Sequence, residues 1–220
     1  MKRTHLYTGV AVLTFAALAY LLAWSSIFSV KSVSIVGAPT QESQALVLRL
    51  VDVEKNLPLA RVEPRSISRR ISTIDWVEKS SVSRNWFRGT VKVTLSPRKP
   101  IAYFNGKTLD ASGKVFLLPG FTGATLPEVS SPRPSLGLAA INLFEALPSE
   151  VQRTVISLDA TNESGFNLRI LRDGRAISIS WGKNEQNELK LKVIDALLAK
   201  PENKKIQRID VSAPHAPIVK

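Results

Sequence analysis

The feature that most constrains this 220-residue chain is an apolar run close to its first residue. Residues 6–24 read LYTGVAVLTFAALAYLLAW, without a charged residue or a proline, and the charge-free stretch continues to Val30. A helix over these residues would be about 28 Å long, close to the hydrocarbon thickness of a bilayer. The run predicts one transmembrane helix over Leu6 to Ile27, after a short tail of residues 1–5.

A cleaved signal peptide is the competing interpretation, because Lys2 and Arg3 precede the apolar run. Two features favour an uncleaved anchor. The run is longer than the roughly 7–15 residues of a typical signal core, and no suitable small-residue cleavage site follows it. The basic residues before the run favour a cytoplasmic N-terminus. We therefore expect a single-pass protein with its bulk outside the cytoplasm.

Composition excludes several kinds of site. The chain has no cysteine, and its histidines, His5 and His215, lie at opposite ends, so disulfides and thiolate metal sites are ruled out. We expect no metal and no cofactor. The net charge of +12 favours contact with anionic surfaces or acidic partners, or it serves only solubility. Its basic residues are scattered rather than clustered between aromatic residues, so we expect no nucleic-acid partner.

A β-α-α-β-β pattern follows the apolar run and predicts a first folded domain over residues 28–97. Thr40 is suited to cap its first helix, and Pro97 and Pro100 stop its last strand at a domain boundary. Its elements are expected at Phe28–Val36, Gln41–Val51, a helix that opens at Pro64 with Ile67, Ile71 and Ile74 on one face, Val77–Arg84 and Thr90–Leu95.

Residues 98–220 predict a mostly antiparallel β domain with flanking helices, so the fold class is α+β. The strongest signal is Asn105-Gly106, which suits the positive φ angles of a type I′ hairpin turn. Strands are expected at Ile101–Phe104, Lys107–Asp110, Val115–Leu118, Val155–Asp159, Gly165–Leu171, Ala176–Trp181 and Ile206–Val211, helices at Leu136–Leu147 and Glu185–Ala199, and an irregular loop at Pro119–Pro134.

No catalytic motif emerges from the residues. Phosphate-binding glycine patterns, G-x-S-x-G and H-E-x-x-H are all missing. Ser96 and Lys99 match S-x-x-K, but prolines surround the motif and its S-D-N and K-T-G partners are missing. We therefore expect no catalytic residue and no enzymatic activity.

The order and spacing of several short segments resemble the FtsQ/DivIB family of bacterial cell-division proteins, over essentially the whole chain. The chain departs from the family at Pro97, where glutamate is usual, and at Phe87-Arg88-Gly89, which replaces a proline-led turn. The matching segments are Phe28–Gly37 (F-x-V-x-x-I-x-V-x-G), Asp75–Trp86 (W-V-x-x-A-x-V-x-R-x-W), Arg98 with Pro100 and Ala102, Leu109–Phe116, Leu126-Pro127 and Ile209–Val211.

The resemblance implies a non-enzymatic scaffold of the divisome. The domain after the anchor would be a POTRA domain, an adaptor fold that binds polypeptides. The protein would sit in the cell membrane, enriched at the division septum, and join FtsB- and FtsL/DivIC-like partners to wall-synthesis proteins of the FtsW and FtsI type. A weak homodimer is a further option. Another POTRA-containing adaptor for secretion or assembly is the alternative, and a membrane-anchored wall enzyme is a second rival.

The last predicted strand is the candidate partner-binding site. A partner segment could add to an exposed sheet edge, with backbone pairing giving affinity and side-chain pockets giving specificity. If this strand is instead central, it only completes the core. The candidate residues are Ile206, Arg208, Ile209, Asp210, Val211 and Ser212.

Overall fold

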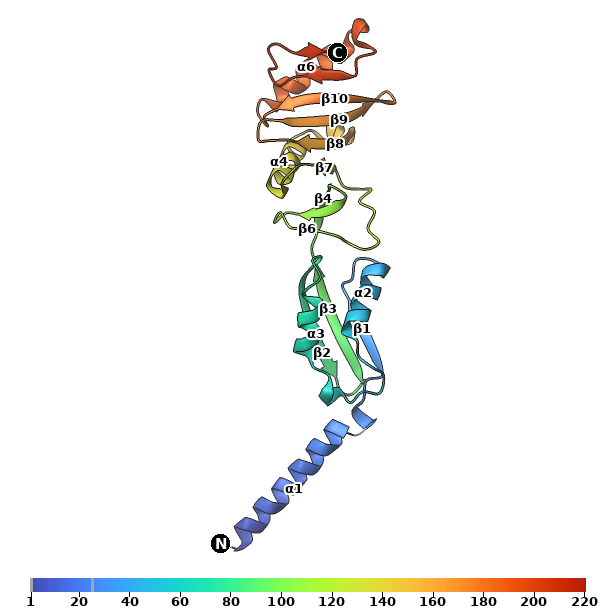
Figure 1. Ribbon diagram of the computed structural model, residues 1–220, viewed down its shortest axis with the longest axis vertical. Helices are drawn as coiled ribbons and strands as arrows, with labels where there is room; N and C mark the ends of the chain where they lie inside the picture. The colour runs from blue at the N-terminus through green and yellow to red at the C-terminus, as the bar shows by residue number, and fades with distance from the viewer. Residues whose placement is uncertain (1, 25) are drawn as a thin grey trace. The chain divides into compact units, whose positions relative to one another are not determined.

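The computed structural model describes residues 2–24 and 26–220, although the side chains of residues 2–6, 21–24 and 26 lie outside that description (Figure 1). The chain divides into two compact units. The first comprises residues 1–98 with 119–121, and the second comprises residues 99–118 with 122–220.

Helix α1 covers Lys2–Trp24, and a short 3₁₀ helix, η1, covers Ser26–Phe28. Across residues 2–24 and 26–220, no helix is both long and apolar enough to cross a membrane. The span predicted over Leu6 to Ile27 includes Ser25, which lies outside the described residues. That span stays a prediction from the sequence.

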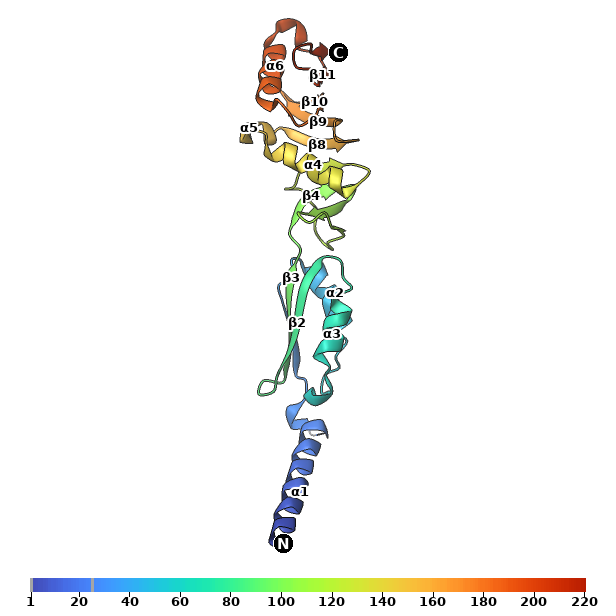
Figure 2. The ribbon, with the colours of Figure 1, turned by 90° about the vertical axis from the view of Figure 1, so that its left-hand side faces the viewer.

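The first unit contains the predicted β-α-α-β-β order. Its three-stranded sheet has the order β1-β3-β2, with β1 parallel and β2 antiparallel to the central β3. Figure 2 shows α2 and α3 on the same face of this sheet. The elements are β1 (Ser32–Val36), α2 (Gln41–Val51), η2 (Leu59–Arg61), α3 (Pro64–Ile71), β2 (Val77–Asn85) and β3 (Thr90–Pro97).

The first strand begins later than expected, at Ser32 rather than Phe28. The preceding residues pair with a loop instead of with the sheet. Ser29 forms an isolated bridge with Pro58, and the Val30 N–H donates to the Leu57 carbonyl at 2.8 Å. The alternation of apolar residues therefore begins before the strand, in a segment that is irregular but hydrogen-bonded.

Thr40 caps α2 as predicted. Its Oγ1 accepts from the Ser43 N–H at 3.0 Å, while the Ser43 Oγ accepts from the Thr40 N–H at 3.0 Å. This reciprocal arrangement satisfies backbone donors that the first helical turn leaves without helical partners. Helix α3 ends at Ile71, so Ile74 lies beyond it. The buried core of the unit includes Val47, Val51, Ile67, Ile71, Val91 and Val93.

Residues 99–220, all of them described, form a nine-stranded sheet in the order β12-β11-β10-β9-β8-β7-β4-β5-β6. Strands β7 and β12 and helix α5 are absent from the sequence prediction. The elements are β4 (Pro100–Phe104), β5 (Lys107–Asp110), β6 (Val115–Phe116), β7 (Glu128–Ser130), α4 (Pro134–Glu145), α5 (Ser149–Gln152), β8 (Val155–Ala160), β9 (Phe166–Arg172), β10 (Arg175–Gly182), α6 (Asn187–Ala199), η3 (Pro201–Asn203), β11 (Arg208–Asp210) and β12 (Ile218–Val219).

The sheet of the second unit is mixed: five of its eight strand pairings are antiparallel, in line with the expectation, and three are parallel. Strands β4 and β7, β7 and β8, and β10 and β11 pair in parallel. Parallel neighbours require a crossover connection rather than a tight turn. Helices α4 and α5 lie between β7 and β8 along the chain, and α6 lies between β10 and β11. The Asn105-Gly106 turn is confirmed, with φ angles of 46° and 80° joining the antiparallel β4 and β5.

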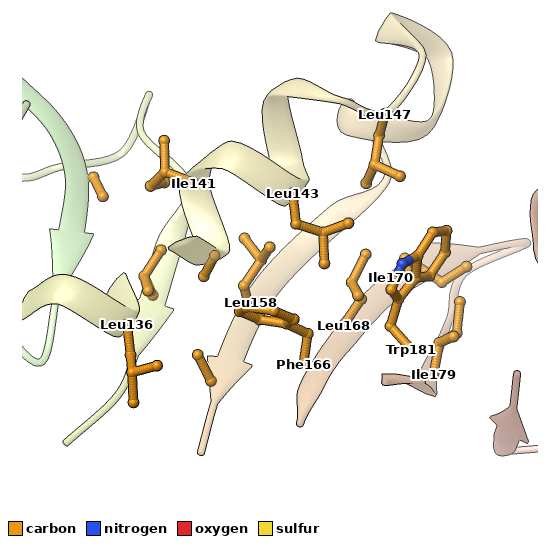
Figure 3. Packing of buried hydrophobic residues seen from close by; sticks show 14 of the residues in the cluster. Leu136, Ile141, Leu143, Leu147, Leu158, Phe166, Leu168, Ile170, Ile179 and Trp181 are labelled. Atoms are coloured by element: carbon orange, nitrogen blue, oxygen red, sulfur yellow. The ribbon is translucent and has the colours of Figure 1, made fainter. Parts of the chain in front are cut away.

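The core of the second unit lies between its helices and one face of the sheet. Figure 3 shows Leu136, Ile141 and Leu143 of α4 near apolar side chains from β8, β9 and β10. The opposite face carries exposed polar side chains such as Arg169 and Ser178. The inward residues include Leu158, Phe166, Leu168, Ile170, Ile179 and Trp181, all of them buried.

Candidate functional site

The candidate strand β11 lies one position in from the margin of the nine-stranded sheet. On its inner side it runs parallel to β10, with Ile179 opposite Ile209 and Ser180 opposite Asp210. The Val211 N–H continues this pairing by donating to the Ser180 carbonyl at 2.9 Å. The inner side of β11 is therefore fully engaged with the sheet.

The outer side of β11 is covered by β12, a strand of only two residues. Val219 lies opposite Ile209, and Ile218 lies opposite Asp210, in antiparallel register. The Arg208 and Lys220 backbones exchange hydrogen bonds, each N–H donating to the other carbonyl at 3.0 Å. The expectation of a free edge at Ile206–Ser212 is therefore corrected, because β12 occupies that edge.

The six candidate residues divide into two groups by exposure. Ile209 and Val211 are 0% exposed and belong to the apolar core. Ile206 is half-buried and packs against the same core, Asp210 is half-buried, and Arg208 and Ser212 are exposed. Only the exposed and half-buried residues could present side chains to a partner, whereas the side chains of Ile209 and Val211 are buried in the core.

A tight turn ends β11. The Asp210 Oδ1 accepts from the Ser212 N–H at 2.9 Å and from the Ser212 Oγ at 2.7 Å. Gly182, at the end of β10, has a φ of +75°, and a Cβ added there would come within 2.8 Å of the Ser212 Cβ. The glycine thus permits the close approach of the two chain segments.

The Lys190 side chain of α6 binds the backbone at the end of β10. Its side chain is 2% exposed, and its Nζ donates to the Trp181 carbonyl at 2.9 Å and to the Lys183 carbonyl at 2.7 Å. Nζ also lies 5.5 Å from the centroid of the Trp181 ring, a cation–π geometry. Burial lowers the pKa of Lys190, and the nearby Glu185 carboxylate opposes that shift.

Sequence reasoning missed β12, which is the element that decides how β11 can be reached. Ile218 and Val219 are β-branched and follow Pro217, but two residues are too few to display strand periodicity. Among residues 2–24 and 26–220, no group of three or more histidine, cysteine, aspartate or glutamate side chains could hold a metal ion. At the candidate strand itself, the contacts are backbone pairings of β11 with β10 and β12.

Two protein-family models match the chain. Residues 28–98 match the FtsQ-type POTRA domain, and residues 102–212 match the C-terminal region of cell division protein FtsQ/DivIB. The two matched ranges together account for most of the chain.

Curated relatives carry the name cell division protein FtsQ. The relative from Mycolicibacterium smegmatis is 28% identical over 211 residues, which is 93% of this chain and 61% of the relative. That from Mycobacterium tuberculosis (strain ATCC 25618 / H37Rv) is 28% identical over 195 residues, 84% of this chain and 58% of the relative. That from Streptomyces venezuelae is 30% identical over 177 residues, 73% of this chain and 63% of the relative. This chain therefore spans less than two thirds of the length of each.

Proposed function

Because this chain belongs to the FtsQ/DivIB family of cell-division proteins, we propose that it is a non-enzymatic scaffold of the division machinery. It holds FtsB- and FtsL/DivIC-like proteins at the septum and links them to wall-synthesis proteins of the FtsW and FtsI type. The observation that carries this proposal is the pairing of β11 with only a two-residue strand on its outer side, which offers a place for a partner strand.

The scaffold is held in the cell membrane by Leu6 to Ile27. This part of the proposal is supported by the absence of charge over residues 6–24 and by the basic residues before them. The folded units then lie outside the cytoplasm. Membrane extraction tests the anchor: the full chain should resist alkaline carbonate and dissolve in detergent, and release by carbonate alone would contradict it.

A partner segment binds at β11 by taking the place of β12. Strand β12 itself is a poor template for strand addition, because it has two residues and Pro217 before it lacks a backbone N–H. Beneath β12, Arg208 presents both its N–H and its carbonyl to the outer side of β11, where they now bond to Lys220. A longer partner strand would keep these bonds and extend the pairing along the flanking residues.

Side chains beside β11 then give the partner its specificity. Arg208 and Ser212 are exposed, and Asp210 is half-buried. Arg208 lies in the same cross-strand row as Ser178 and Arg169 on the polar face of the sheet. A partner segment with an acidic side chain over this basic row would pair with it electrostatically.

Depletion of the protein in its own bacterium tests the proposed function. We expect cells to keep growing without dividing, as filaments or branched cells, and a plasmid copy of the full chain to restore septation. A fluorescent fusion that complements should concentrate at the septum. Normal septation after depletion, with impaired export of envelope proteins, would contradict the proposal and favour a secretion or assembly adaptor.

A further inference from the structure

The turn between β2 and β3 carries a large apolar side chain that the first unit leaves in water. Phe87 is 97% exposed, the highest value among the exposed large apolar side chains of the described residues. Figure 2 shows this turn projecting beyond the sheet. We call residues 85–89 the β2–β3 tip. Phe87 packs against nothing that would account for its presence in the fold.

The base of the β2–β3 tip is held in a defined shape. The Arg88 N–H donates to the Asn85 Oδ1 at 3.0 Å, and Gly89 has a φ of +65°. The Trp86 ring lies edge-on to Phe28, with centroids 6.2 Å apart, and the Arg84 guanidinium carbon lies 5.2 Å from the Trp86 centroid. These contacts hold Trp86 in place. Phe87 therefore projects from a turn whose base is held by its neighbours.

The β2–β3 tip lies at the end of the first unit where the chain enters it. The Lys31 N–H donates to the Gly89 carbonyl at 2.7 Å, and a Cβ added at Gly89 would come within 2.7 Å of the Ser29 carbonyl oxygen. Ser29 follows Ile27, the last residue of the proposed anchor, by two positions. The tip is therefore close along the chain and in space to the point where the unit meets its anchor.

The charges around the β2–β3 tip are mainly basic. Lys31 and Arg88 are exposed beside it, and Arg84 lies at its base. The loop from Asp52 to Leu57, which bonds to Val30, adds two carboxylates and one lysine at this end. An aromatic side chain beside basic residues suits the boundary of an anionic bilayer, where aromatic rings lie at headgroup level and cations meet lipid phosphates.

We propose that the β2–β3 tip is a second membrane contact, in which Phe87 enters the headgroup region of an anionic bilayer and Arg88 and Lys31 bind lipid phosphates. The inference rests on the proposed anchor, because the anchor brings this end of the unit to the membrane. A single helix alone leaves the unit free to tilt and rotate. A second contact limits both motions and so fixes which faces of the scaffold are presented to partners.

The absence of cysteine from the chain permits a direct test with single-cysteine variants of the full chain. Phe87→Cys, Ser72→Cys and Val12→Cys are each labelled with an environment-sensitive fluorophore and reconstituted into vesicles of phosphatidylglycerol and phosphatidylcholine. Ser72 is the matched control, because it is exposed in the same unit and follows α3 at the opposite end of the strands. Val12 reports on the anchor.

The label at position 87 should show blue-shifted emission and quenching by nitroxide lipids, and the label at position 72 should behave as in water. Adding Arg88→Ser to Phe87→Cys should reduce the blue shift in the anionic vesicles. An aqueous signal at position 87 with a lipid signal at position 12 overturns the inference and leaves the anchor intact. An aqueous signal at position 12 with a lipid signal at position 87 overturns the anchor, and with it the inference of a second contact, because the tip would then bind the bilayer without the anchor. Aqueous signals at both positions overturn both.

Discussion

Lys220 and Arg208 form a reciprocal backbone pair, in which the N–H of each donates to the carbonyl oxygen of the other at 3.0 Å. This pair closes the outer side of β11 with a segment of the same chain. Net contributions of such bonds to stability are only about 0.5–1.5 kcal/mol each. Strand β12 therefore covers the edge against unspecific pairing, and the proposed partner strand would displace only a few such bonds.

Deletion of residues 217–220 should strengthen partner capture, since the partner no longer competes with β12. An increase of roughly tenfold in affinity corresponds to about 1.4 kcal/mol, within the range of the bonds removed. Isothermal titration of the full chain with an FtsB-like protein measures the effect. Lys220→Ala is the control, because it keeps the backbone bonds and should bind like the parent chain. Loss of capture by the deletion, with the unit still folded, would identify β12 itself as the docking strand.

Lys190→Met should lower the free energy of unfolding by about 1–3 kcal/mol, because two buried carbonyl oxygens lose their donor. Urea unfolding of the full chain in detergent measures this loss. Lys192→Met provides a control on the same helix, since Lys192 is exposed, and should change stability by no more than about 0.5 kcal/mol. Equal losses in the two variants would show that the Lys190 contacts do not stabilise the fold.

The same lysine predicts a dependence on pH. Burial lowers the pKa of Lys190 below its ordinary value of 10.5, so the unfolded chain holds this proton more strongly than the folded protein does. Stability therefore rises with pH between the folded-state pKa and 10.5. The stability difference between the parent chain and Lys190→Met should grow in favour of the parent over that window. A difference that stays constant or shrinks would contradict the stated effect of burial.

Thr40→Ala should destabilise the first unit by about 1 kcal/mol, the usual cost of losing an N-cap. The Thr40 Oγ1 also donates to the Pro119 carbonyl at 2.5 Å, so the full cost should exceed that of the cap alone. Thr40→Ser keeps the hydroxyl and should retain most of the stability. Thermal unfolding of both variants checks this, and an equal loss in the two would show that the methyl group, rather than the hydroxyl, is what matters.

Local chemistry made parts of this fold predictable. Thr40 predicts the start of α2 because a hydroxyl at that position binds a free helical N–H. Asn105-Gly106 predicts the hairpin because both residues tolerate positive φ. Strands β7 and β12 have no such local signal. Strand β7 is held by pairing with β4 and β8, which are remote in sequence, and β12 is too short to display strand periodicity before it pairs with β11.

The position of the candidate site depended on the pairing of β11 with β12. The alternation over Ile206–Val211 predicted a strand, and β11 lies within this range. Whether β11 forms an edge depends on Ile218 and Val219, which follow it after a turn. The burial of Ile209 and Val211 likewise depends on the helices that cover the sheet. The sequence pattern shows that apolar and polar residues alternate here, but it does not show which strands and helices pack against them.

Photocrosslinking from position 208 in dividing cells tests the central claim, that β11 captures a partner segment, most directly. Arg208→benzoylphenylalanine should crosslink to the FtsB-like protein. The matched probe at Arg169 lies in the same cross-strand row but two strands inward, and is also exposed, so it should give no such product. Equal crosslinking from both positions, or none from position 208 while the protein is at the septum, would contradict the claim.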